Sequence, residues 1–214
     1  MDGIKWIFFD MGSTLIDESK VYEMINRKMA EDAGVSYEYV CEKSLEFYKQ
    51  NKKGDLEVSK MLGVECAKWD PELEILYECT VDVLETLKSK YKLGIIANQM
   101  YGSEKRLENF GIRKYFDVIV ASAEEGVEKP DRRIFEIALE RAGIEASEAV
   151  MVGDRIDNDI VPANKMGMKT IWVKQGNGRF WKIAGDEEKA DLEAETLSDM
   201  RDWCNRYYIS KRRN

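Results

Sequence analysis

Short runs of apolar residues, each about the length of a β-strand, recur along the chain and are separated by stretches with helical periodicity. The runs are residues 4–9, 93–97, 118–121, 150–152 and 170–173. Their apolar residues are largely consecutive rather than alternating, which is typical of parallel strands that are buried on both faces. We therefore predict an α/β fold with a doubly wound parallel sheet that is covered by helices.

A helical pattern separates the third run from the fourth. Residues 130–142 carry apolar side chains that can form one packed face, and Gly143 follows as a C-terminal stop. Strand, helix and strand thus alternate as they do in βαβ units, which supports the parallel sheet.

The long segment between the first and second runs has a different pattern. Residues 17–80 contain no convincing strand, and apolar residues at helical spacing occur twice within them. We predict a small α-helical domain inserted after the first strand, called the helical insertion below (residues 17–80). Residues 1–16 and 81–214 then form the α/β core. The alternative is that these helices pack directly on the core. The helical positions are Val21, Met24, Ile25, Met29, Leu56, Met61 and Leu62, with breaks at Gly34 and at residues 52–54.

Length and charge restrict the possible partners. The 214 residues suffice for one sizeable core and a modest accessory domain. The net charge of −8 argues against nucleic acid as a partner, and the basic tail at residues 211–213 is too short to reverse this. The first apolar run is too brief for a signal peptide or a membrane span. We expect a cytoplasmic protein without a membrane partner; no motif specifies an oligomeric state.

The chain contains no histidine, which restricts its chemistry more than any other count. Ser–His–Asp triads, cysteine–histidine dyads and histidine metal sites are excluded. The four cysteines form no CxxC pair, so neither a zinc site nor a disulfide framework is expected. Acid–base or metal chemistry must therefore rely on carboxylates, lysines and backbone groups. The cysteines are Cys41, Cys66, Cys79 and Cys204.

Polar residues follow the apolar runs at the places where strands are predicted to end. In open α/β sheets, ligands bind at the carboxyl ends of the strands, so we expect these residues to lie together. They are Asp10 after the first run, Asn98 and Gln99 after the second, Lys129 beyond the third, and Asp154 with Asp159 after the fourth.

Carboxylates that crowd together raise one another's pKa unless a cation lies among them. Oxygen ligands without histidine or cysteine favour Mg²⁺, which binds one or two carboxylates together with waters and substrate phosphate. A lysine beside them can neutralise an anionic nucleophile or a phosphoryl group in transfer. The sequence therefore predicts a magnesium site that handles phosphate.

Four segments of the chain resemble, in the same order, the four signature motifs of the haloacid dehalogenase superfamily of hydrolases. The helical insertion resembles the cap domain that many members carry after the first motif. The matching segments are residues 8–10 with 14–17, residues 95–98, residues 128–130 with 134–135, and residues 152–154 with 158–160 and 163–168.

The resemblance implies a role for each matching residue. Asp10 would be the nucleophile that forms an aspartyl-phosphate, and Lys129 would balance its charge. Backbone N–H groups around Asn98 would hold phosphate oxygens, so that the substrate site includes Ala97, Asn98, Gln99 and Thr14. Mg²⁺ would be bound by Asp10, the carbonyl of Gly12 and Asp154, with Asp159 binding the ion or its waters. The implied activity is Mg²⁺-dependent hydrolysis of a small phosphorylated metabolite.

The sequence departs from the family pattern at two positions. Phosphatases of this family usually carry a second aspartate two residues after the nucleophile, which protonates the leaving group and later activates water. Gly12 occupies that position, so this general acid and base is missing. A general acid–base group is worth ~10²–10⁴-fold in rate. Glycine also tolerates a positive φ, which is an alternative reason for its presence. Ala97 replaces the usual serine or threonine and removes a phosphate hydrogen bond worth roughly 1.5–3 kcal/mol.

Three functions are consistent with these departures. The first is a phosphatase of reduced or selective activity, which acts on leaving groups that need little protonation or borrows an acid from the cap, the substrate or water. The second is a haloacid or phosphonate hydrolase; the latter would need a Schiff-base lysine, for which Lys52 and Lys53 are candidates by location. The third is a binding or regulatory protein that has lost turnover.

Overall fold

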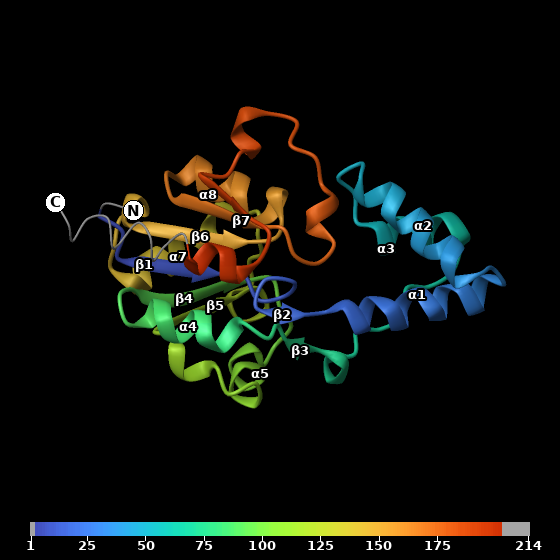
Figure 1. Ribbon diagram of the computed structural model, residues 1–214, viewed down its shortest axis with the longest axis horizontal. Helices are drawn as coiled ribbons and strands as arrows, with labels where there is room; N and C mark the ends of the chain where they lie inside the picture. Colours follow the sequence, from blue (N-terminus) through green and yellow to red (C-terminus); the bar gives the residue numbers. More distant parts are fainter. Residues whose placement is uncertain (1–2, 203–214) are drawn as a thin grey trace.

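A parallel sheet of six strands forms the centre of the α/β core (Figure 1). The structure is a computed structural model that describes residues 3–202. The strand order in the sheet is β5-β4-β1-β6-β7-β8. The strands are β1 (Trp6–Phe9), β4 (Lys92–Ala97), β5 (Val118–Ala121), β6 (Ala149–Gly153), β7 (Lys169–Val173) and β8 (Leu192–Ala194).

Helices connect the strands and cover both faces of the sheet, which confirms the predicted fold class. They are α4 (Thr80–Lys88), α5 (Ser103–Asn109), α6 (Ser122–Glu125), α7 (Arg132–Ala142) and α8 (Val161–Met166), with a π-helical turn η4 (Ile156–Ile160) and short 3-10 segments η1 (Pro71–Leu73), η2 (Arg113–Tyr115), η3 (Ala146–Glu148), η5 (Gly178–Phe180) and η6 (Asp186–Glu188).

Five strands coincide with the five predicted apolar runs. The sixth, β8, was not predicted, because an edge strand of three residues in which only Ala194 is buried gives no apolar run. Helix α7 begins two residues later than predicted, since the side chain of Asp131 accepts a hydrogen bond from the N–H of Arg133 at 2.8 Å and caps it. The predicted stop at Gly143 is confirmed by its left-handed φ of 65°.

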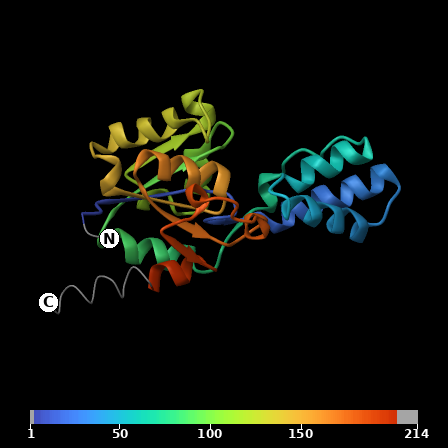
Figure 2. The same ribbon diagram turned by 90° about the horizontal axis from the view of Figure 1, so that it is seen from above.

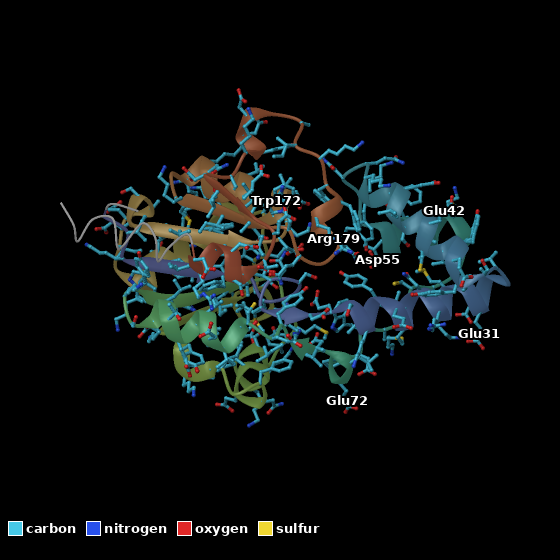
Figure 3. All side chains as sticks on the ribbon, in the orientation of Figure 1. Glu31, Glu42, Asp55, Glu72, Trp172 and Arg179 are labelled. Atoms are coloured by element: carbon cyan, nitrogen blue, oxygen red, sulfur yellow. The ribbon has the colours of Figure 1, made fainter. Side chains whose placement is uncertain are left out.

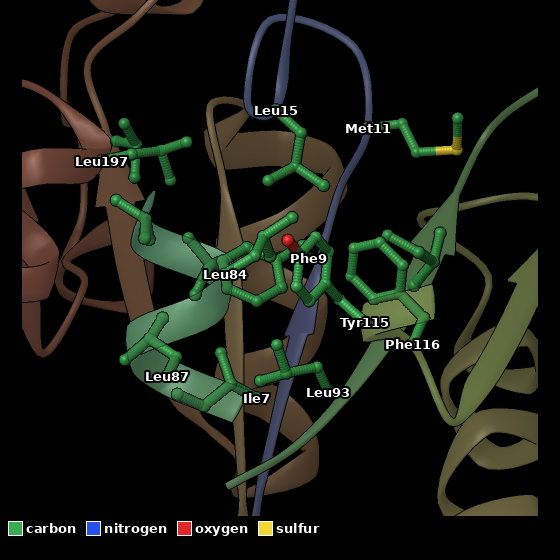
Figure 4. Close-up of a cluster of buried hydrophobic side chains, with 14 of the residues drawn as sticks. Ile7, Phe9, Met11, Leu15, Leu84, Leu87, Leu93, Tyr115, Phe116 and Leu197 are labelled. Atoms are coloured by element: carbon green, nitrogen blue, oxygen red, sulfur yellow. The ribbon is translucent and has the colours of Figure 1, made fainter. Parts of the chain in front are cut away.

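Alternating side chains of β1 point to opposite faces of the sheet, as the pleat of a strand requires. Ile7 and Phe9 pack against Leu84 of α4 in one core cluster (Figure 4). Phe8 packs against Phe135 of α7 in the cluster on the other face. The central strand is therefore buried on both faces, which explains its continuous apolar sequence.

Helices α1 (Ser19–Ala33), α2 (Tyr37–Tyr48) and α3 (Gly54–Leu62) pack around an apolar cluster of their own. No strand was predicted within residues 17–80, and this expectation was wrong in one detail. Strand β3 (Ile75–Leu76) pairs with β2 (Ile16–Asp17) at the place where the chain leaves and re-enters the core. Strands of two residues are too short to produce a periodic signal. The buried members of the cluster are Val21, Ile25, Met29, Ala30, Val40 and Val58.

The helical insertion projects to one side of the α/β core in both ribbon views (Figures 1 and 2). It also contacts the core at the loop around η5. The side-chain amide of Asn51 donates to the carbonyl of Lys182 and accepts from its N–H, both at 2.8 Å. Asn177 donates to the hydroxyl of Tyr48 at 3.1 Å. Figure 3 labels Asp55 of the insertion and Arg179 of the core beside this contact.

Within residues 3–202, no helix combines the length and the apolar character that a membrane span requires. Cys41, Cys66 and Cys79 are free thiols. Cys204 and the basic tail at residues 211–213 lie outside the described residues.

We expect truncation of the central strand to be costly. Phe8 is fully buried between the sheet and α7, so Phe8→Ala should lower the free energy of unfolding by about 3–5 kcal/mol through lost burial and a residual cavity. Tyr101→Ala is the control, because its side chain is 81% exposed and should change stability by about 0.5 kcal/mol at most. Urea denaturation measures both, and similar values for the two variants would contradict the assigned core.

Candidate active site

The residues predicted from the strand ends converge on one cavity at the carboxyl edge of the sheet. The cavity has a volume of about 560 Å³ and lies between the core and the helical insertion. The predicted residues that line it are Asp10, Gly12, Asn98, Gln99, Lys129, Asp154 and Asp159.

Lys129 joins two of the carboxylates. Its Nζ lies 2.6 Å from Asp10 Oδ1 and 2.6 Å from Asp159 Oδ1, and the lysine is only 3% exposed. Burial alone would lower the pKa of this ammonium, but the two carboxylates raise it above its usual value. Lys129 is therefore a fixed positive charge beside Asp10.

Asp10, Asp154 and Asp159 form a compact group in which one oxygen of each lies within 4.8 Å of the others. Burial, followed by the charges of Asp10 and Asp159, raises the pKa of Asp154 well above its usual value. Burial likewise raises the pKa of Asp159 to about 6, although Lys129 opposes this. One lysine does not balance three carboxylates. The excess negative charge and the hard oxygen donors fit a divalent cation such as Mg²⁺.

The turn after β6 places Asp159. The π-helical turn η4 follows the strand, and the N–H of Arg155 donates to Asp159 Oδ2 at 3.0 Å. Gly153 is required here, because a Cβ at this residue would lie 2.6 Å from the Cβ of Asp159. The indole of Trp172 donates to the carbonyl of Asp154 at 2.9 Å and fixes the start of the turn. Single-turn π-helices of this kind are frequent at functional sites.

Asn98 has a role that the sequence did not reveal. Its side-chain amide donates to the carbonyl of Lys129 at 2.8 Å and accepts from the N–H of Lys129 at 2.7 Å. The end of β4 therefore fixes the backbone that carries the lysine. The neighbouring N–H of Gln99, one of the groups expected to hold phosphate, donates to Ser122 Oγ at 3.0 Å.

Two of the predicted substrate-binding residues lie away from the cavity lining. Ala97 and Thr14 are fully buried, and neither lines the cavity. The hydroxyl of Thr14 is buried without a hydrogen-bond partner among the described residues. Direct contact of these two residues with substrate stays a prediction.

The part of the cavity that faces the helical insertion contains residues that no motif marked. Tyr22, Lys53 and Trp69 line it from the insertion, and Arg106 lines it from α5. Arg106 binds the buried carboxylate of Glu74 through Nε at 2.7 Å and Nη2 at 2.6 Å. The contact of Arg106 with Glu74 joins distant segments, so no local pattern could predict it.

The two candidate Schiff-base lysines are placed differently. Lys53 lines the cavity, whereas the ammonium of Lys52 lies over the ring of Phe47, 5.7 Å from its centroid.

Glu18 also lines the cavity and was not predicted as a site residue. It is buried, and its Oε2 accepts a hydrogen bond from Ser13 Oγ at 2.9 Å. Burial raises the pKa of Glu18 to about 8; the Ser13 hydroxyl opposes this rise, and the charge of Asp10 adds to it. Gly12, beside it, does not have a positive φ, whereas Ser13 does, at 54°. The backbone therefore does not explain the glycine at residue 12.

Known proteins resemble this chain in sequence and in fold. The sequence profile of the family described as "Haloacid dehalogenase-like hydrolase" matches residues 7–173. A glyceraldehyde 3-phosphate phosphatase of Methanocaldococcus jannaschii is 30% identical over 226 residues, covering 93% of this chain and 96% of its own. A protein of the same name from Pyrococcus abyssi is 34% identical over 199 residues, covering 81% and 82%. Among solved structures, a phosphatase of the same superfamily from Thermococcus onnurineus is 26% identical, has a TM-score of 0.64, and the match covers 94% of this chain and 98% of that one.

The cluster of Asp10, Asp154 and Asp159 predicts a specific response to Mg²⁺. A saturating ion, at about 100 times its Kd, should stabilise the fold by ~2.7 kcal/mol, which corresponds to about 5–10 °C in Tm. Asp154→Asn should abolish this shift, and Asp157→Asn, in the same turn but outside the cavity lining, should preserve it.

The shift should also depend on pH. Protonation of Asp154 and Asp159 competes with the ion, so the stabilisation should be present above their raised pKa values and lost as the pH falls through them; for Asp159 that value is about 6. Thermal unfolding with and without Mg²⁺ between pH 5 and pH 8 measures this. An equal shift in Asp154→Asn would show that the ion binds elsewhere.

Proposed function

The chain belongs to the haloacid dehalogenase-like hydrolase family, and within it we propose that it is a Mg²⁺-dependent phosphomonoesterase that acts through an aspartyl-phosphate on Asp10. One observation carries the proposal. Asp10 lies at the end of the central strand with Lys129 Nζ at 2.6 Å and with two further carboxylates close by. This arrangement supplies a nucleophile, a balancing charge and ligands for a cation in one cavity.

A small phosphorylated metabolite is the proposed substrate. The relatives from Methanocaldococcus jannaschii and Pyrococcus abyssi are both named glyceraldehyde 3-phosphate phosphatases. The cavity of about 560 Å³ is of the size that accommodates a small molecule. We place the enzyme in the cytoplasm, where its free thiols would remain reduced.

The cation would be held by Asp10, the carbonyl of Gly12 and Asp154, with Asp159 beside them. When bound, Mg²⁺ supplies electrostatic stabilisation of the phosphoryl oxygens and neutralises the carboxylates. The remaining steps involve residues of the protein. Asp10 attacks phosphorus, and Lys129 balances the charge as the phosphoryl group arrives. Asn98 keeps the lysine in place by its two hydrogen bonds to the Lys129 backbone.

We propose that the helical insertion, residues 17–80, acts as the cap that selects the substrate. Tyr22, Lys53 and Trp69 line the cavity from the insertion, while the phosphate-binding residues belong to the core. The part of the metabolite beyond its phosphate would therefore contact the insertion. The bonds of Asn51 with Lys182 and of Asn177 with Tyr48 support a defined position for the cap over the cavity.

Asp10→Asn tests the nucleophile directly. The amide cannot form the acyl phosphate, so kcat for an aryl phosphate should fall on the order of 10³-fold or more with little change in Tm. Asp131→Asn is the matched control, because asparagine also caps a helix well and α7 lies outside the cavity lining. Phosphate release in the presence of Mg²⁺ or EDTA is the measurement.

Phosphate release, halide release and Mg²⁺ binding together separate the alternatives. Substantial phosphatase activity in Asp10→Asn would contradict the covalent mechanism. Halide release from a haloacid would favour a dehalogenase. Mg²⁺ binding without any turnover in the wild type would favour a binding protein.

A further inference from the structure

Glu18 lies where the chain enters the helical insertion, and its side chain turns back into the cavity. It precedes α1 in the N-cap position, yet it makes no capping hydrogen bond to the helix. Its Oε2 accepts from Ser13 Oγ at 2.9 Å instead, and it lines the same cavity as Asp10 and Lys129. The carboxyl group is therefore held at the active site by the core loop.

The Glu18 carboxyl group fills the space that a side chain at residue 12 would need. A Cβ added to Gly12 would lie 2.8 Å from Glu18 Cδ and 2.9 Å from Oε2, with Oε1 closer still. Separations of this size are shorter than nonbonded contacts, so a side chain at residue 12 would require the flexible end of Glu18 to move. The space beside Gly12 is thus occupied by the Glu18 carboxyl group, and the φ of Gly12 is not positive.

The loop that holds Glu18 adopts an uncommon backbone conformation. Ser13 has a φ of 54°, which is unusual for a residue with a side chain. Gly176 approaches it closely, because a Cβ there would lie 2.5 Å from both Cβ and Oγ of Ser13. Backbone strain of this kind clusters at active sites, where it positions functional groups. The Ser13 hydroxyl of this loop donates its hydrogen bond to Glu18.

We propose that Glu18 is a further catalytic residue, whose carboxyl group acts as the general acid and base that Gly12 lacks. This assignment rests on the proposed function, in which Asp10 is the nucleophile. The acid would come from the first residues of the helical insertion, six positions later in the chain than the usual aspartate, but it would act from the same space.

The proposed reaction proceeds in two steps. Asp10 attacks phosphorus, and the ester P–O bond breaks. The leaving oxygen keeps the electron pair of that bond and takes a proton from the Glu18 carboxylic acid. The alcohol departs and leaves an aspartyl-phosphate and a Glu18 carboxylate. That carboxylate then takes a proton from water as the water oxygen attacks phosphorus. The bond from phosphorus to Asp10 breaks, its electrons return to Asp10, and phosphate leaves with Glu18 protonated again.

Glu18→Gln separates this role from a structural one, because the amide keeps the shape and still accepts from Ser13. An alkoxide leaves poorly without a proton, whereas a nitrophenolate leaves readily. We expect kcat/KM to fall ~10²–10⁴-fold for an alkyl phosphate and less than about 10-fold for p-nitrophenyl phosphate. Glu23→Gln, on the exposed side of α1, is the matched control and should change the two substrates equally and little.

A relocation experiment adds an independent arm. Glu18→Ala should lose alkyl phosphate hydrolysis, and Gly12→Asp added to it should recover at least ~10-fold, because the vacated space then accommodates an aspartate. Gly12→Asp alone would displace Glu18 and should not exceed the wild type. If the Glu18 variants fold poorly, as judged by Tm, the wild type still provides a test. Its kcat/KM across aryl phosphates should depend only weakly on leaving-group pKa.

Three outcomes would overturn the assignment. Equal losses for alkyl and aryl phosphates in a folded Glu18→Gln would show a structural role only. No loss for either substrate would show that Glu18 does not take part, while the Asp10 mechanism would stand. If the wild type hydrolyses neither substrate in an Asp10-dependent manner, the proposed function fails and the role of Glu18 fails with it.

Discussion

Three clustered carboxylates, two of which bind one lysine, are the constraint on which the rest of the active site depends. Asp10, Asp154 and Asp159 repel one another, and burial strengthens this repulsion because little water screens it. Lys129 offsets part of the charge through contacts at 2.6 Å with two of them. The remainder favours a divalent cation, and the bound ion would in turn attract a phosphate. The electrostatics of these side chains thus favour the chemistry that we propose.

Lys129 and Asp10 come from separate parts of the sheet, and a residue between them holds the lysine in place. Lys129 lies beyond β5, whereas Asp10 ends β1 two strands away in the sheet. The amide of Asn98, at the end of the intervening strand β4, bonds both backbone groups of Lys129 and bridges this separation. The order β5-β4-β1-β6 therefore brings the four motif segments to one edge, each from the end of its own strand or the loop beyond it.

The sequence was sufficient for the sheet and for the residues at its carboxyl edge, because both follow from local patterns. Continuous apolar runs predict buried parallel strands, and polar residues at their ends mark the site. Strand β8 and the β2–β3 pair are too short to give such a signal. The pairing of Arg106 with Glu74 joins residues 32 positions apart, so neither residue indicates its partner locally.

At residue 12, too, the sequence does not indicate which residue lies beside it. Aligned with its family, the chain lacks an aspartate there, and the sequence alone indicates either a lost catalytic group or a requirement of backbone geometry. The structure excludes the second reason, since Gly12 does not have a positive φ. Glu18, which lies in the turn between β2 and α1, fills the space beside residue 12. Because this residue begins the helical insertion, the placement of the proposed acid is linked to the placement of the cap.

Stereochemistry at phosphorus tests the central claim, the covalent role of Asp10, most directly. A phosphate ester made chiral with three oxygen isotopes would be hydrolysed by the wild-type enzyme with Mg²⁺, and the configuration of the product would be determined. Attack by Asp10 followed by attack of water inverts phosphorus twice, so the account predicts net retention. Net inversion would show a single direct attack by water and would contradict the aspartyl-phosphate mechanism.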